Sequence, residues 1–354
     1  MSSARTRVAS PDSTAPAKQR GVLAGAVRLL LRRPELVAVA GTVAVFIFFA
    51  LEAGGSGFLS RLGTTTYLDV AANIGILAAP VTLLLVAGEF DLSVGAAVGT
   101  VGIVEAFLVV DQDWPFWAGF LVALCVAAAI GLTNGLIVVT SGIPSFLVTL
   151  AMMWALQGTS LALTKSYTNQ TSITGITDAS AHSSLARLFR GNAGGLPMSV
   201  WWWLGISAFA AWVLHRTRFG NWVYAVGGSK DAAVRSGVDA RRVKVALFTA
   251  VPVAAVIVAT LSSLEVNQAD VNRGPGMEFQ TIVAAVIGGT LISGGAGSPI
   301  GTLFGALLFG MVSQGFFFTN IDSNWFLTFL GTVLLVAVAI NQYVRHQQLK
   351  RDTG

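Results

Sequence analysis

The sequence predicts an all-α polytopic membrane protein with about ten transmembrane helices. Hydrophobic residues make up 54% of the 354 residues and charged residues only 11%, whereas a soluble globular chain carries roughly 25% charged residues. The mean hydropathy is +0.71, and one transmembrane helix needs about 20 apolar residues. This composition excludes a soluble enzyme, a disordered chain and a chain with a large extramembrane domain.

Apolar runs between polar residues place the individual helices. No small-residue cleavage site follows the first apolar run, so we expect the first helix to be retained. Pro80 interrupts the second helix and Gly288-Gly289 the eighth; such breaks are tolerated where protein or a water-filled path satisfies the backbone. The expected helices lie near 36–51, 66–87, 93–110, 116–140, 144–163, 199–215, 244–264, 280–293, 299–319 and 324–343.

The basic residues predict the orientation of these helices. Ten crossings put both termini on one side, and cytoplasmic loops are enriched in Lys and Arg. Residues 1–33 and 216–244 hold seven basic residues each and 341–354 hold three, so 17 of 22 fall on one side. This clustering at the edges of apolar blocks is explained by orientation better than by nucleic-acid binding, so we expect cytoplasmic termini and no nucleic-acid partner.

These crossings also predict the domain organisation. We expect a basic cytoplasmic tail over 1–35, a transmembrane domain over 36–343 and a cytoplasmic tail over 344–354. The longest cytoplasmic loop is then 216–244, and the longest external loop is 164–198, with one short helix near 180–190.

The turn Gly88–Gly95 places two acids beside apolar segments. Asp91 and Ser93 could cap the following helix, because a side-chain oxygen there meets free N–H groups. One interpretation of Glu89, Asp91 and Ser93 is a capped turn at the membrane edge, and the other is contact with a translocated solute.

The loop 216–244 contains signals for one short helix. Ser229 is a good N-cap, Asp231 suits the first turn, Arg235 the last turn and Gly237 the position after the C-cap. So short a helix is not stable alone. It docks either on its own chain at the headgroup surface or on a cytoplasmic partner.

The glycine-rich segment 284–301 contains no phosphate-binding loop, because G-x-x-x-x-G-K-[ST] is absent here and elsewhere in the chain. We therefore expect no nucleotide site and no cofactor in this chain. The spacing of Gly301, Gly305 and Gly310 is typical of close helix packing.

Polar residues within the spans are few, and burying them is costly. Asp69 and Asn73 are four apart and share a helix face. Each such residue could form a helix–helix hydrogen bond, and as a group they could line a path for a neutral hydroxylated solute. They show no catalytic or metal-ligand spacing, and the single cysteine, Cys125, permits no disulfide within one chain. The candidate path residues are Asp69, Asn73, Glu89, Asp91, Ser93, Asn134, Gln157 and Asn267.

Three motifs in this order resemble the membrane permeases of bacterial ABC importers for simple sugars, the ribose/xylose/galactose type. They are D-L-S-V-G at Asp91–Gly95, Y-A-V-G-G-S-x-x-A-A-x-x-S-G-V at Tyr224–Val238 and A-x-V-I-G-G-T-x-x-x-G-G-x-G-S at Ala284–Ser298. The resemblance extends from about residue 65 to 343. Glu89-Phe90 is a departure, because family members have a second glycine and an aliphatic residue there.

The resemblance implies a multi-pass permease of the bacterial plasma (inner) membrane that pairs with a second copy or a close paralogue. A separate ATPase subunit would hold ATP and Mg, and a periplasmic or lipid-anchored solute-binding protein would deliver the sugar. The short helix then resembles a coupling helix, in which small residues let it sit close to the ATPase. The coupling residues are Gly228, Ser229, Asp231, Ala232, Ala233, Arg235 and Gly237.

Three alternatives remain at this point. An ion-driven secondary transporter would need intramembrane ion sites, for which Asp69, Glu89, Asp91 and Glu105 are the candidates, and it leaves the capped cytoplasmic helix unexplained. A membrane-embedded enzyme would need a nucleophile–base pair or metal ligands. The same permease class could also carry a polyol, a nucleoside or a furanose-type signal molecule.

Overall fold

A computed structural model describes residues 34–319, 321–322 and 325–352, so nearly all of the expected N-terminal tail lies outside the described residues. Ten of the helices in the described residues correspond one to one with the ten expected spans. They are α2 (Pro34–Ala53), α3 (Arg61–Val86), α4 (Val94–Ala106), α5 (Phe116–Ser141), α6 (Ser145–Thr168), α8 (Met198–Arg216), α11 (Ala240–Val266), α12 (Met277–Ile287), α13 (Pro299–Gly315) and α14 (Trp325–Asp352).

Eight segments among the described residues are long and apolar enough to cross a membrane. The other two are α12, with 11 residues, and the apolar part Trp325–Val336 of α14. Several boundaries differ from expectation: α3 begins five residues earlier, α6 ends five residues later, α12 ends at Ile287 and not near 293, and α14 continues past residue 343 to Asp352. Helix α3 continues through Pro80, which is buried among its neighbours.

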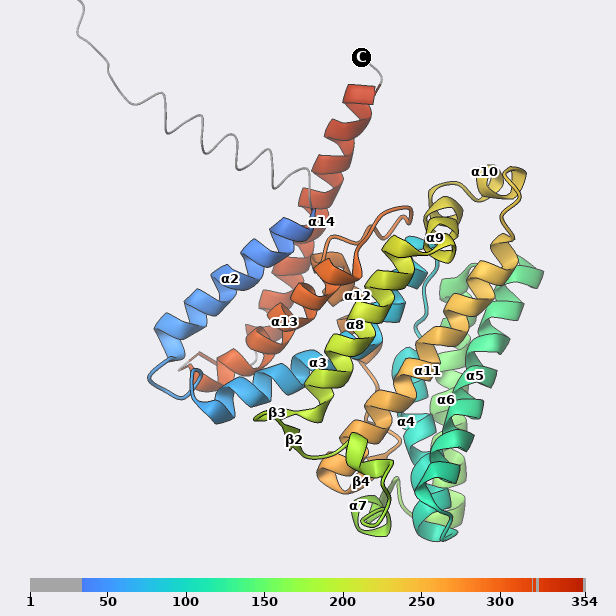
Figure 1. Ribbon diagram of the computed structural model, residues 1–354, viewed down its shortest axis with the longest axis vertical. Coiled ribbons are helices and arrows are strands. Elements are labelled where there is room, and N and C mark those ends of the chain that lie inside the picture. Colours follow the sequence, from blue (N-terminus) through green and yellow to red (C-terminus); the bar gives the residue numbers. More distant parts are fainter. Residues whose placement is uncertain (1–33, 320, 323–324, 353–354) are drawn as a thin grey trace, which may run out of the picture.

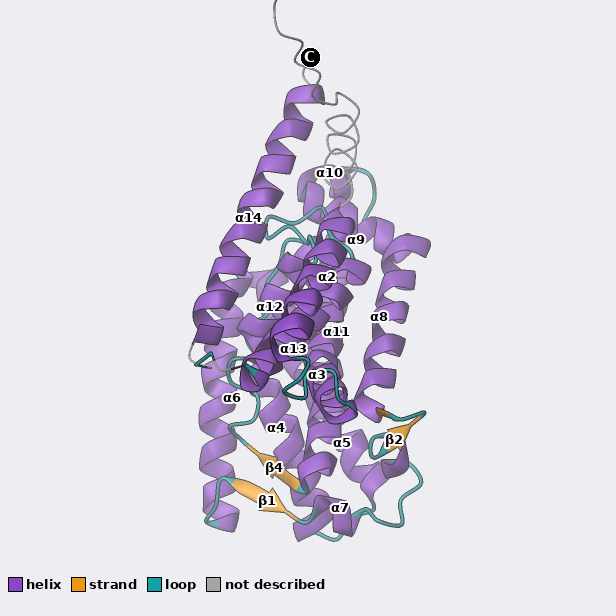
Figure 2. Ribbon diagram, turned by 90° about the vertical axis from the view of Figure 1, so that its left-hand side faces the viewer, coloured by secondary structure: helices purple, strands orange, loops and turns teal. Residues whose placement is uncertain are grey.

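The short elements gather at two opposite ends of the bundle (Figures 1 and 2). One end, called here the coupling end, carries α9 (Arg218–Gly228), α10 (Lys230–Arg235) and the last residues of α14. The other, called here the strand end, carries α7 (Ile176–Ala179), the 3-10 turn η2 (Ala186–Leu188) and two small antiparallel sheets. In these sheets β1 (Ser172–Thr174) pairs with β4 (Gln268–Asp270), and β2 (Asn192–Ala193) with β3 (Leu196–Pro197).

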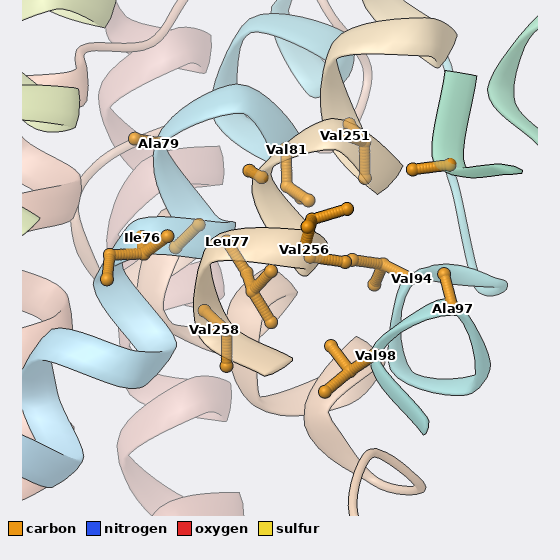
Figure 3. Close-up of a cluster of buried hydrophobic side chains, with 14 of the residues drawn as sticks. Ile76, Leu77, Ala79, Val81, Val94, Ala97, Val98, Val251, Val256 and Val258 are labelled. Atoms are coloured by element: carbon orange, nitrogen blue, oxygen red, sulfur yellow. The ribbon is translucent and has the colours of Figure 1, made fainter. Parts of the chain in front are cut away.

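Helices α3, α4 and α11 form the centre of the bundle. Figure 3 shows Leu77 and Val81 of α3 meeting Val256 of α11, with Val94 and Val98 of α4 on the facing side. These five side chains are at most 1% exposed. Such continuous apolar burial leaves few places for a polar path, and the polar side chains described below lie outside this apolar cluster.

Glycines allow α12, α13 and α3 to pack with their backbones in contact. A Cβ atom on Gly301 of α13 would collide with the carbonyl oxygen of Gly288 at the end of α12, and one on Gly305 with that of Ala284. A Cβ on Gly310 would meet the carbonyl oxygen of Tyr67 in α3. The close packing expected from the Gly301, Gly305 and Gly310 spacing is therefore confirmed.

The chain returns into the bundle between α11 and α12. After β4 it lies against α4, with Val271 beside Gly99 and Gly274 beside Gly95. Helix α12 begins only at Met277, and the buried carboxylate of Glu278 accepts the Gly276 N–H at 3.0 Å. The N-terminus of α12 therefore lies inside the bundle beside α4, and not at the strand end.

Candidate functional site

The expected short helix is present at the coupling end as α10, and it follows α9 with one residue between them. Ser229 joins the two, because its backbone N–H donates to the Ala225 carbonyl of α9 at 3.0 Å while its Oγ accepts the Ala232 N–H of α10 at 3.4 Å. Gly237 closes α10 with φ +84°, the left-handed conformation that favours glycine. Sequence reasoning located α10 from its caps but missed α9.

Neighbouring alanines in α10 face opposite ways. Ala233 is 3% exposed and belongs to the hydrophobic core of its own chain. Ala232, Asp231 and Arg235 are exposed, as is Gly237. The expectation that both alanines approach a partner is therefore wrong for Ala233, because the helix uses that methyl group to dock on the bundle. Ala232 lies on the free surface.

The end of α9 contacts two loops that precede transmembrane helices. A Cβ on Gly227 would collide with the Val86 carbonyl oxygen at the end of α3. Gly295, in the loop before α13, lies beside Gly228 and donates its N–H to the same Val86 carbonyl at 2.8 Å. The Tyr224 hydroxyl of α9 also donates to the Gly297 carbonyl at 2.8 Å. A displacement of the α9–α10 unit would thus be transmitted directly to both loops.

The loop between α3 and α4 holds a buried polar cluster. The Asp91 carboxylate accepts the Ser93 N–H at 2.8 Å and the Ser93 hydroxyl at 2.6 Å, and the Asn134 amide of α5 donates to that hydroxyl at 2.9 Å. Ser93 is the N-cap of α4 but makes no side-chain capping bond. The expected cap is therefore wrong for Ser93, whose hydroxyl bonds to Asp91 and Asn134, whereas the Asp91 carboxylate does accept a free backbone N–H at the start of the helix, that of Ser93.

Burial determines the electrostatics of this cluster. Asp91 is 1% exposed, and its Oδ2 has no partner among the described residues. Desolvation raises the pKa of Asp91 to about 6, although the two hydrogen bonds from Ser93 oppose the rise. Two residues earlier, Glu89 forms an ion pair with Lys244 of α11. Sequence reasoning missed Lys244, which it used only as a cytoplasmic basic residue.

A second polar site lies at the strand end between α3, α8, α11 and the 176–199 loop. It is a pocket of about 540 Å³ lined by acidic, basic and hydroxyl groups. Asp69 accepts hydrogen bonds from Asn73 at 3.1 Å and from Ser199 of α8. Glu265, Arg187 and Arg190 also line the pocket. Sequence reasoning found Asp69 and Asn73 but missed the loop arginines, because only the fold brings residues 187–199 beside α3.

The structure separates the eight candidate path residues. Glu89, Asp91, Ser93 and Asn134 lie together near the coupling end, and Asp69 and Asn73 lie together near the strand end. Asn267 caps α11 and ties α7 to it, since its Oδ1 accepts the Thr177 N–H and its Nδ2 donates to Asp178, both at 2.8 Å. Gln157 is half-buried on α6 and joins neither group.

No group of three His, Cys, Asp or Glu side chains that could hold a metal ion occurs in the described part of the chain.

Comparison with known proteins gives a consistent set of relatives. The family described as the permease component of the branched-chain amino acid transport system matches residues 63–338. The ribose import permease protein of Escherichia coli (strain K12) is 31% identical over 267 residues, which cover 75% of this chain and 81% of that protein. No solved structure matches the chain.

Two further relatives cover more of the chain. The fructose import permease protein of Rhizobium meliloti is 29% identical, with 98% of this chain and 94% of that protein covered. The xylose transport system permease protein of E. coli (strain K12) is 28% identical, with 85% and 90% covered. The similarity thus includes the bundle, the α9–α10 unit and the loops that it contacts.

Proposed function

The chain belongs to the family of ABC-transporter permease components described above, and on that premise we propose that it forms the membrane path of an importer for a monosaccharide. It is a transport subunit and not an enzyme, since its relatives are permeases. The names of the relatives, which are ribose, fructose and xylose permeases, support a sugar over the amino acid in the family description.

The charge balance of the strand-end pocket carries this proposal. Two carboxylates, Asp69 and Glu265, face two guanidinium groups, Arg187 and Arg190, so the lining has no net charge. Arg190 is already held by the Ala181 carbonyl at 2.9 Å. A neutral solute with several hydroxyl groups can donate to carboxylates and accept from a guanidinium without bringing a charge out of water. A sugar meets this requirement, whereas an amino acid would have to bring both its ammonium and its carboxylate out of water, and the names of the relatives also favour the sugar.

The α9–α10 unit supports coupling to a separate ATPase. In the proposed cycle, ATP binding closes the ATPase pair, and the exposed face of α10 follows its surface. The motion passes through Gly227 and Gly228 to the loops that precede α4 and α13. These helices then change the access of the path from one side to the other. Selection of the solute rests mainly with an external binding protein, while weak polar contacts in the path allow release.

Partners and orientation complete the proposal. Permeases of this family work with ATPase and solute-binding subunits, and we propose that a second copy of this chain or a close paralogue completes the path. The coupling end faces the cytoplasm, with both termini, in the plasma (inner) membrane. The strand end, with its pocket, receives the solute-binding protein. The observation that supports this orientation is the group of basic residues in 216–244 at the coupling end.

Reconstituted transport tests the proposed solute. The permease, its ATPase and its binding protein are placed in proteoliposomes, and ATP-dependent uptake of labelled ribose, xylose, fructose and leucine is compared. We expect uptake of one sugar and none of leucine, with Asp69→Asn lowering sugar uptake at least about tenfold because a charged acceptor is lost. ATP-dependent leucine uptake without sugar uptake would replace the sugar by an amino acid and leave the permease class intact.

A further inference from the structure

A second pocket lies at the coupling end, beside the exposed face of α10 that carries Lys230, Val234 and Arg235. Its volume is about 680 Å³, and it is enclosed by α10, the first turns of α11 and the last turns of α5. Val138 and Val139 of α5 form an apolar part of its wall. The pocket therefore has charged walls from α10 and α11 and an apolar wall from α5.

The polar lining carries an excess of positive charge. Four basic side chains line the pocket, namely Lys230, Arg235, Arg241 and Lys244, together with the acids Asp231 and Asp239. Two of these six form ion pairs: Lys244 with Glu89, and Asp239 with Arg242 at 2.9 Å.

Three cations remain around the pocket. Among the described residues, Lys230, Arg235 and Arg241 form no ion pair, and Asp231 is the one lining acid that is likewise unpaired. The charges that are not neutralised by a neighbour thus favour an anion.

An exposed apolar stripe leads from this pocket along α5. Leu132, Leu136 and Val139 are four and three residues apart and share one helix face. Leu132 is 45% and Leu136 46% exposed, although α5 is one of the membrane-crossing segments. Val139 lines the pocket itself, so the stripe starts where the cationic lining ends.

We propose that this pocket, between α5, α10 and α11, binds the phosphate headgroup of an anionic phospholipid, whose acyl chains lie on the Leu132–Leu136 stripe of α5. The cations account for the anionic headgroup, and the stripe accounts for a lipid in place of a soluble anion. Basic pockets between transmembrane helices at a membrane surface are suited to such headgroups. The bound lipid would contact α10 through Lys230 and Arg235 and leave Ala232, which does not line the pocket, free.

Native mass spectrometry of the full-length permease in detergent tests the site, with phosphatidylglycerol and phosphatidylcholine titrated separately. The pocket variant is Arg235→Gln/Arg241→Gln. The control is Arg216→Gln/Arg218→Gln, which removes the same charge from exposed residues of the neighbouring α8–α9 junction that do not line the pocket. Inorganic phosphate is added in a third series.

We expect phosphatidylglycerol to bind wild type in preference to phosphatidylcholine. The pocket variant should bind it about 30-fold more weakly, as two surface cations contribute about that factor, and the control should not show a comparable loss. Equal losses in both variants, or equal binding of both lipids, would overturn the proposal. Displacement of phosphatidylglycerol by millimolar inorganic phosphate would assign the pocket to a soluble anion and also overturn it.

Discussion

Glu89 and Lys244, which are 155 positions apart in the chain, form an ion pair in which the two side chains are 10% and 14% exposed. Glu89 belongs to the loop before α4, and Lys244 lies in the second turn of α11. The pair therefore connects the helix that follows α10 to the loop that α9 also contacts. Glu89 departs from the pattern of the permeases that the sequence resembles, and the ion pair with Lys244 accounts for an acid at this largely buried position.

Removing one partner of this pair should destabilise the protein. Glu89→Gln leaves the Lys244 ammonium largely buried without its counter-charge, and breaking a buried pair in this way costs about 3–5 kcal/mol. The exchange Glu89→Lys/Lys244→Glu should recover most of the loss. Thermal unfolding of the detergent-solubilised protein measures both. Single and exchanged variants with the unfolding temperature of wild type would show that the pair adds no stability.

The two alanines of α10 should give different phenotypes. Ala232→Glu places a charge on the free surface, so the permease should fold normally but co-purify poorly with the ATPase. Ala233→Glu inserts a carboxylate into the core under α10, which costs several kcal/mol and should lower the unfolding temperature of the permease alone. Co-purification and thermal unfolding separate these effects. Normal ATPase binding and transport by Ala232→Glu would exclude the exposed face of α10 as the contact.

Asp91 should make stability depend on pH in a defined direction. Its pKa is raised from 3.8 in the unfolded chain to about 6 in the folded protein, so folding is favoured most below pH 4 and loses stability as pH rises towards 6. At neutral pH this shift lowers the free energy of unfolding by about 3 kcal/mol, and about 2 kcal/mol of that decrease occurs between pH 4.5 and pH 7.5.

Asp91→Asn keeps the acceptor for Ser93 but cannot ionise, which makes it the matched comparison. The free energy of unfolding of this variant relative to wild type should increase by about 2 kcal/mol between pH 4.5 and pH 7.5. Thermal or denaturant unfolding at each pH measures the difference. A difference between the two proteins that does not change with pH would mean that Asp91 titrates normally.

A methyl group should be tolerated at one helical glycine and not at another. Gly301→Ala places a Cβ on the Gly288 carbonyl and forces α12 and α13 apart, a typical overpacking cost of about 1–3 kcal/mol. Gly158→Ala on α6 meets no atom within 4 Å and should be neutral or slightly stabilising, because alanine is the better helix former. Unfolding temperatures and expression levels compare the two, and equal effects would contradict the close packing.

Cysteine labelling should verify the orientation. In a Cys125→Ala background, which removes the exposed native thiol, cysteines at Lys230 or Arg235 should react with an impermeant reagent only after the cytoplasmic side is opened. Cysteines at Lys165 or Arg187 should react in intact cells. The reverse pattern would invert the proposed topology without altering the fold.

The sequence was sufficient for the number and order of the long helices, because ten apolar runs are separated by polar residues. It was less informative where a helix is short or amphipathic. Helix α9 escaped notice because Arg218 and Asn221 interrupt its apolar residues. Helix α10 was found because Ser229 and Gly237 mark its ends chemically.

The polar sites were harder to predict for a different reason. A polar residue in an apolar helix indicates that burying it costs desolvation free energy, but it does not show which neighbouring group offsets that cost by a hydrogen bond or an ion pair. Asp69 and Asn73 were grouped correctly because they are one turn apart. The contact of Asp69 with Ser199, and that of Glu89 with Lys244, depend on how distant helices pack, which periodicity does not encode.

The half-length α12 has a consequence for how the protein is made. Eleven residues rise only about 16 Å, roughly half of the hydrocarbon thickness of a bilayer. The segment before it, residues 271–276, consists of turns that lie against Gly95 and Gly99 of α4. Nascent α12 is therefore a poor independent substrate for insertion machinery. We therefore expect α12 to reach its place only after α13 has followed it as a hairpin and with α4 already in the membrane.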